Sequence, residues 1–441
     1  MNTDIKRAEI LKKLCLGSSY VFSYAYVYLF TGTYGFSELF ITIYLTLLSV
    51  GAIIWLEMSM RQQQLLGKND PTRSELCETR FWEVILILLS LSTFSGELQA
   101  LSLFFIHAVV IYMVLSGTGH LLFRRSSVLL PADMINGFFV IPFVNFFRRI
   151  LTIGECIHPK DEIVEVILPD GSTVAGKKSE KKPLNTFGIF MVLIIITGFF
   201  FAALSNLVSV DNHFSDAVSS IEHFFDNVSV ADSIGRFIFS LPIGAFLFGL
   251  FQGSARKEDT LERKIHDKLV SFSPRLRFMP DTILTIVLSL FSMLYIAFFI
   301  SQASYMFSAF AGVLPEAFTA SEYAVSGFHE LINVVLINFA LLATVRLFGS
   351  HDRKLLRILS VILMVESMVF ATISASKIIL YMSRFGYTLS RTLGLWGTTV
   401  VFAGSVLAVI HLLKEKKTFA PWLWYSAGSY VVTAIITWFF V

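Results

Sequence analysis

The stretch ILSVILMVESMVFATISA (residues 358–375) decides the fold, because it is a continuous apolar run that contains a single charged residue, Glu366. A helix of this length can cross the hydrocarbon core of a bilayer, which is about 30 Å thick. The run does not alternate apolar and polar residues with a period of two, as a strand of a membrane barrel would. Because only helices and closed barrels satisfy their backbone hydrogen bonds in lipid, we predict a transmembrane helix here.

Similar apolar runs recur along almost the whole chain. Of its 441 residues, 55% are hydrophobic and only 15% are charged, whereas about a quarter of the residues in soluble domains are charged. This composition excludes an ordinary soluble domain. We predict an all-α, polytopic transmembrane helix bundle of about eleven spans. The predicted spans are residues 14–31, 36–56, 82–96, 98–116, 187–206, 236–252, 282–305, 329–346, 358–375, 392–412 and 420–440.

The distribution of basic residues predicts the orientation of these spans. If the N-terminus is inside, all but four of the 35 Lys and Arg residues fall in inner segments. Such a bias is typical of proteins of the plasma membrane, whose cytoplasmic loops are rich in Lys and Arg. We therefore predict a multi-pass protein of the cell membrane with a cytoplasmic N-terminus and an extracytoplasmic C-terminus. The basic residues flank apolar runs, so the lipid bilayer is the expected partner and nucleic acid is not.

Two segments of the chain do not read as spans. Residues 118–150 carry Arg pairs at both ends and are interrupted by Pro131 and Pro142, so we predict helices that lie in the inner membrane interface. Residues 161–176 alternate, turn at Pro-Asp-Gly and alternate again, which predicts a small cytoplasmic β-hairpin that caps the bundle or contacts a cytoplasmic protein partner. The predicted division is therefore residues 1–117 (N-terminal transmembrane helices), 118–185 (cytoplasmic and interfacial segment) and 186–441 (C-terminal transmembrane bundle).

Three stretches carry a resemblance to a known family. They are TASEYAVSGF (residues 319–328), the signature Ser376-Lys377 through Tyr381, Gly386, Thr388 and Arg391, and a span exit from Ala202 to Phe214. In this order and spacing they resemble a family of bacterial membrane proteins known only as a domain of unknown function, of the 4153/4173 type. The resemblance implies the multi-pass topology and no activity. The family usually has an Arg-Glu pair where this chain has Val325 and Ser326, which places any role of that pair in doubt.

Glu366 is the most informative single residue. An ionised carboxylate in the middle of a span costs several kcal/mol, so the side chain should face the bundle and be paired or protonated. It could act in a proton or cation relay, with His107 of span 98–116 as a second member. Equally, Glu366 could be a protonated group that hydrogen-bonds a neighbouring helix and fixes the packing, and His107 a structurally satisfied histidine.

Basic residues gather in a segment that is predicted to lie outside. Lys377, Arg384 and Arg391 run against the usual orientation bias, which suggests a site for an anion or a lipid headgroup. The alternative is that these side chains reach the outer interface and pair there without a function in binding.

A third group of polar residues opens span 329–346. His329, Glu330 and Asn333 lie within one helical turn or so and could line a binding cavity, or join helices by hydrogen bonds. Ligand-spaced metal motifs, nucleotide-binding loops and a paired set of cysteines are absent from the sequence. The sequence therefore predicts neither a metal site nor a cofactor.

Three classes of function stay open at this point. The span count, Glu366 and His107 favour a transporter or a small-molecule or lipid-binding bundle. The charged loops and the hairpin would suit a non-enzymatic membrane sensor or regulatory protein. A membrane enzyme that acts on a lipid-linked substrate would need catalytic groups gathered at one interface, for which Lys377, Arg384 and the acidic residues of the outer loops are the candidates.

Overall fold

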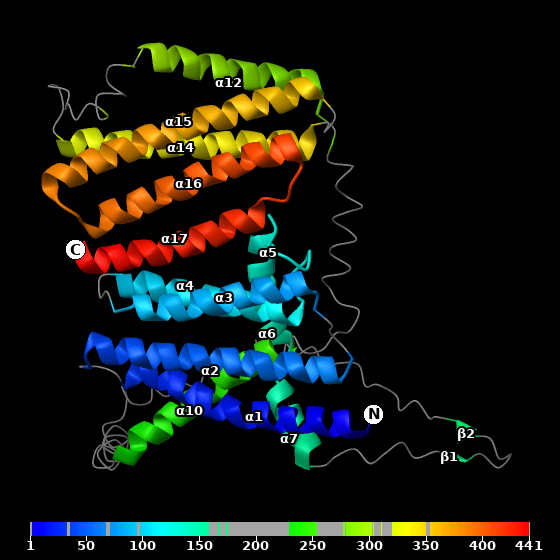
Figure 1. Ribbon diagram of the computed structural model, residues 1–441. Helices are drawn as coiled ribbons and strands as arrows, with labels where there is room; N and C mark the ends of the chain where they lie inside the picture. Colours follow the sequence, from blue (N-terminus) through cyan, green and yellow to red (C-terminus); the bar gives the residue numbers. More distant parts are fainter. Residues whose placement is uncertain are drawn as a thin grey trace, which may run out of the picture. The chain divides into compact units, whose positions relative to one another are not determined.

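A computed structural model of the chain is almost entirely helical (Figure 1). It describes residues 2–32, 36–67, 71–94, 98–157, 166–167, 173–174, 229–253, 277, 279–301, 303, 310, 320–349 and 353–440. The helices are α1 (Asn2–Thr31), α2 (Glu38–Leu65), α3 (Arg73–Ser92), α4 (Gln99–Thr118), α5 (Leu130–Ile135), a π-helical segment (Asn136–Val140), α6 (Ile141–Val144), α7 (Arg148–Ile157), α10 (Ser229–Gly253), α12 (Asp281–Ser301), α14 (Ala320–Phe348), α15 (Lys354–Phe385), α16 (Leu389–Lys414) and α17 (Phe419–Phe440).

Six helices in the described part of the chain are long and apolar enough to cross a membrane: α2, α4, α10, α12, α15 and α16. Apolar helices of this length match the thickness of a bilayer, and a soluble protein does not contain so many of them. The prediction of a polytopic, all-helical membrane protein is therefore confirmed in its coarse form, whereas the number of eleven spans is not supported.

The remaining predicted spans do not meet this criterion of length and apolar composition, each for its own reason. Helices α1 and α17 form where predicted but are rich in Tyr, Ser or Trp, which lowers their hydropathy. Acidic and basic residues occupy the first half of α3, and the described apolar part of α14 is only Ile332–Phe348. The predicted span 187–206 lies outside the described residues.

The chain divides into two compact units, and the division falls inside α3 and α4. The second unit comprises residues 84–106, 121–130 and 259–441. Within it, α15 is the central helix and packs against α12, α14 and α16, while α17 packs against α16. Figure 1 shows these five helices side by side, with their long axes running in similar directions. Their apolar core includes Leu288, Val335 and Leu363, all fully buried.

Helix α12 shows why this unit suits lipid as its solvent. Ile286, Leu290 and Met293 form an exposed apolar stripe along one face of the helix. The opposite face, which packs on α15, buries the polar residues Ser292 and Tyr295. Water would favour the reverse arrangement, whereas in hydrocarbon the apolar side chains face outward and the polar groups find partners inside.

The first unit comprises residues 1–83, 107–120 and 131–258. In it, α1 packs against both α2 and α10. The ring of Trp55 on α2 stacks on Phe251 of α10 with centroids 4.5 Å apart. One turn after Trp55, Ser59 accepts a 3.0 Å hydrogen bond from Gln252 of α10. Aromatic stacking and buried side-chain hydrogen bonds therefore hold these helices together.

The predicted interfacial segment, residues 118–150, contains α5, the π-helical segment, α6 and the start of α7. By composition, residues 130–156 could also be a broken span or a re-entrant loop, because the two halves are bent by 46° at a short break. Within the first unit, however, Figure 1 shows the run from α6 to α7 lying across the long axes of α1 and α2. A helix that lies across its neighbours adds no crossing, so this direction favours the interfacial prediction.

The predicted β-hairpin coincides with two short strands. Val166 and Ile167 of β1 (Val166–Ile167) pair antiparallel with Val174 and Thr173 of β2 (Thr173–Val174). Residues on either side of these strands lie outside the described part of the chain. The hairpin as a whole, its cytoplasmic location and any partner therefore stay predictions.

Candidate functional site: buried polar groups between α12, α14 and α15

Glu366 lies in the middle of α15 and faces the interior of the second unit. Its side chain is buried, and Oε2 accepts a 3.2 Å hydrogen bond from Oγ of Ser292 on α12. Among the described residues, the other oxygen, Oε1, is buried without a hydrogen-bond partner. The structure thus places this carboxyl inside the bundle, as the sequence predicted, and leaves half of its hydrogen-bonding capacity unused.

A chain of three hydrogen bonds adjoins Glu366. The hydroxyl of Tyr295 on α12 donates to Oδ1 of Asn338 on α14 at 2.7 Å. The amide nitrogen of Asn338 donates to Oγ of Ser367 on α15 at 2.9 Å, and Ser367 donates to the carbonyl oxygen of Leu363. Asn338 and Ser367 are completely buried. These bonds join three helices, and each of the polar side-chain atoms of Tyr295, Asn338 and Ser367 has a partner, whereas Oε1 of Glu366 has none among the described residues.

The chemistry available to this cluster is proton exchange rather than covalent catalysis. Hydroxyl and amide groups hold hydrogen bonds but do not titrate near neutral pH, so Glu366 is the titratable group of the cluster on which a proton could be exchanged. A carboxyl of this kind, buried in a span, is a functional candidate by default because its desolvation is costly. Within the described residues, no group of three metal-capable side chains accompanies it.

His107 has a different set of neighbours. It lies half-buried on α4, and its Nε2 is 2.6 Å from the hydroxyl of Tyr26 on α1. The two rings also meet edge to face, with centroids 5.8 Å apart. His107 and Glu366 belong to different units of the chain, so the predicted relay between them stays a prediction.

The structure gives the three basic residues of the predicted outer site distinct surroundings. Lys377 is 2% exposed on α15, whereas Arg384 is exposed in the last turn of the same helix. Arg391 donates to the carbonyl oxygens of Phe385 and Gly386, at 3.1 and 2.7 Å.

Arg391 therefore acts at the end of α15. Its guanidinium lies 4.0 Å from the centroid of the Tyr381 ring and satisfies carbonyl groups that the helix leaves unpaired. Gly386 ends the helix with a φ of 77°, a conformation that favours glycine. These contacts close the turn from α15 to α16, which supports the structural alternative for Arg391.

The third predicted group is only partly described. Asn333 lies on α14 with an exposed side chain. His329 and Glu330 belong to the same helix, but their side chains lie outside the described part of the structure. Asn338, one and a half turns after Asn333, is the residue of this helix that joins its neighbours by hydrogen bonds.

Sequence reasoning did not identify Ser292 and Tyr295 as members of the site. A signal existed, because these two polar residues are three positions apart in a mostly apolar span and so lie on one face of α12. Sequence reasoning also missed Arg149, which was treated only as one of the basic residues of the inner segments. Arg149 is buried between α1, α7 and α10, with its guanidinium 3.4 Å from the centroid of the Tyr20 ring.

Comparison with known proteins adds the family and no activity. The family described as Domain of unknown function (DUF4153) matches residues 81–440. The match confirms the resemblance and extends it toward the N-terminus, beyond the half of the chain that carries the signatures. Neither the curated proteins nor the solved structures contain a match. The chain, a membrane protein with several apolar helices, belongs to the family described as Domain of unknown function (DUF4153).

Proposed function

We propose that this protein carries or binds a small solute or a lipid within the membrane, and that Glu366 takes up and releases a proton in this process. The observation that supports the proposal is the buried carboxyl at the middle of α15, held by Ser292 through one oxygen and unpaired at the other. Burial favours the neutral, protonated form of a carboxyl, and a cation or hydrogen-bonding solute near the free oxygen would change that balance.

The same proposal includes a topology in the plasma membrane with a cytoplasmic N-terminus. Helices α1, α3, α14 and α17 are assigned as further crossings because each has at least 20 residues, and 20 helical residues span about 30 Å. Three of them also pack beside a helix that meets the criterion: α1 beside α2, α14 beside α15 and α17 beside α16. With the six apolar helices, they account for every predicted crossing except residues 187–206.

Reconstitution tests the role of Glu366 without knowledge of the solute. Liposomes that contain the purified protein and a trapped pH-sensitive dye are exposed to pools of small solutes and lipid precursors. We expect at least one pool to change the internal pH with the wild-type protein. Replacing Glu366 by Gln keeps the size and an acceptor for Ser292 but cannot titrate, so the signal should fall at least about tenfold, by analogy with other proton-transfer groups.

Ser374→Ala is the matched control. Ser374 lies on α15 two turns after Glu366, is also buried, and its Oγ has no hydrogen-bond partner among the described residues. This variant should keep the wild-type signal within about twofold, as expected for a change that removes no bond. A signal that survives in Glu366→Gln, or the absence of any proton movement with the wild type in all pools, would contradict the proposal.

A further inference from the structure

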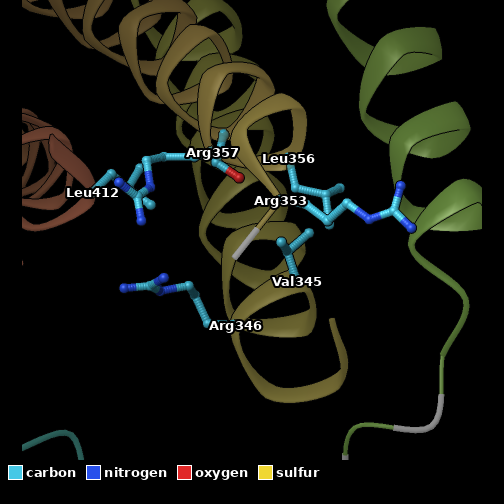
Figure 2. A pocket seen from close by; sticks show the side chains of 7 residues that line it. Val345, Arg346, Arg353, Leu356, Arg357 and Leu412 are labelled. Carbon is cyan, nitrogen blue, oxygen red and sulfur yellow. The ribbon is translucent and has the colours of Figure 1, made fainter. Parts of the chain in front are cut away.

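A second polar site lies at the end of the second unit where α14 ends and α15 begins. There a shallow pocket, open to solvent, is lined by Val345, Arg346, Arg353, Leu356, Arg357, Ser360 and Leu412 (Figure 2). Of the seven described residues that line it, three are arginines and none is acidic. A pocket with this lining attracts anions and repels cations.

Two of the three guanidinium groups point to the same side. In Figure 2 the side chains of Arg346 and Arg357 both extend toward Leu412, which lies on α16. Arg353 extends in the opposite direction, and its Nε lies 3.1 Å from a carboxylate oxygen of Asp281. Arg346 and Arg357 are therefore the pair that an anion in this pocket would meet, whereas Arg353 is already engaged with α12.

The partner of Arg346 is a neutral group. Nη2 of Arg346 donates to Nε2 of His411 at 2.6 Å. The other ring nitrogen of His411 lies 2.7 Å from the carbonyl oxygen of Lys416. A ring nitrogen that accepts from Arg346 carries no proton, so Nδ1 holds the proton and donates to that carbonyl. His411 thus orients Arg346 without neutralising its charge.

The partner of Arg357 is charged but easily displaced. Nη2 of Arg357 lies 2.9 Å from Oε1 of Glu415, whose side chain is 71% exposed. An ion pair that is so open to water contributes little free energy, so an incoming anion can take the place of Glu415. Lys414 and Lys416 are exposed nearby and add positive charge to this end of the unit.

The backbone adds a further attraction for anions. Helix α15 begins after Arg353, which caps it without a side-chain hydrogen bond. The unpaired N–H groups of a first helical turn carry partial positive charge. These groups lie at the start of the helix that carries Arg357. The helix dipole and the two guanidinium groups therefore both attract an anion.

We propose that Arg346 and Arg357 form a binding site for a phosphate group at this end of the helix bundle. Guanidinium groups match the planar pairs of oxygens on a phosphate and bind it through paired, charge-assisted hydrogen bonds. The site lies at helix ends, which in the proposed topology reach the headgroup region of the membrane, so the phosphate is that of an anionic phospholipid or of a free phosphate compound. This site is separate from Glu366 and does not depend on the function proposed for that residue.

Ligand-dependent thermal stabilisation of the full-length protein in detergent tests this site. The two probes are sodium phosphate and a short-chain phosphatidylglycerol, with sodium chloride at matched ionic strength as the reference. A ligand that binds only the folded state raises the unfolding temperature in proportion to its saturation. We expect at least one probe to raise it and to show a half-saturating concentration.

Variants assign the effect to the two arginines. Arg346→Gln and Arg357→Gln should each raise the half-saturating concentration about tenfold, the effect of losing one charge-assisted bond pair. Lys354→Gln removes the same charge from the same helix end, outside the pocket lining, and should change it by less than about twofold. If Arg346→Gln does not fold, Arg346→Lys keeps the charge but loses the paired geometry and should weaken binding as well.

The two probes separate the two sources of the phosphate. A lower half-saturating concentration for phosphatidylglycerol identifies a lipid site, and a lower one for sodium phosphate identifies a soluble ligand. Three outcomes would overturn the proposal: no stabilisation of the wild type by either probe, an equal response of the Arg346 and Arg357 variants and the wild type, or an equal loss in Lys354→Gln.

Discussion

Asn338 is the residue on which the packing of α12, α14 and α15 depends most directly. Its amide accepts from Tyr295 and donates to Ser367, so one side chain links three helices. Asn338→Ala should destabilise the protein by about 1 kcal/mol, within the range measured for hydrogen bonds between membrane helices. Unfolding by denaturing detergent, monitored by helical circular dichroism, measures this loss.

Asn333→Ala provides the comparison, since Asn333 lies on the same helix with an exposed side chain. Its effect should stay within about 0.5 kcal/mol, as is usual for surface positions. Equal losses in the two variants would show that helix propensity, not the buried hydrogen bonds, decides the outcome.

The sequence could identify Glu366 but not the other members of its polar cluster. A lone charge in an apolar run is visible in any window of sequence, and its cost in lipid predicts that it faces the bundle. Ser292 and Asn338 come from helices that are distant in sequence. Only the rotation of each helix about its own axis decides which polar side chains meet, and apolar runs that are hydrophobic all round do not fix that rotation.

At the scale of elements, the close approach of α10 to α6 depends on Gly249. A Cβ atom at this position would lie 2.7 Å from the carbonyl oxygen of Pro142, which is backbone and cannot rotate away. Gly249→Ala should therefore destabilise the protein by about 1–3 kcal/mol, the usual cost of overpacking. The same detergent unfolding experiment measures it.

A substitution at Gly235 of α10 should have the opposite effect on stability. No atom lies within 4 Å of a Cβ at this position, so Gly235→Ala should stabilise the protein by about 0.5–1 kcal/mol through its higher helix propensity. Destabilisation by both substitutions, to the same extent, would contradict the close packing at Gly249.

The elements themselves were largely predictable, because long apolar runs leave the backbone no alternative in lipid. Helices α2, α4, α12, α15 and α16 occur where the runs predicted spans. Helix α14 begins at Ala320, well before its apolar part, Ile332–Phe348. Residues 130–156 were harder to read, since composition alone does not distinguish an interfacial helix from a broken span, and only the direction of the helix does so.

In the whole molecule, the proposed function of Glu366 requires that α15 cross the bilayer with this residue near its centre. Basic residues cluster at the start of α15, at Arg353, Lys354 and Arg357, where the orientation rule predicts the cytoplasm. The far end of the helix, at Gly386 and Tyr387, is then outside. Span number and orientation are properties of the whole chain, because one further crossing, for example at residues 130–156, would invert every later loop.

Cysteine labelling at the two ends of α15 tests this crossing and its orientation. Cys15, Cys77 and Cys156 are first replaced by Ser, and a single cysteine is introduced by Lys354→Cys or Tyr387→Cys, both exposed positions. In intact cells, a membrane-impermeant maleimide should label the Tyr387→Cys protein at once and the Lys354→Cys protein only after the membrane is opened. Labelling of both positions from the same side of the membrane would contradict a crossing by α15, and labelling of position 354 alone would reverse the orientation.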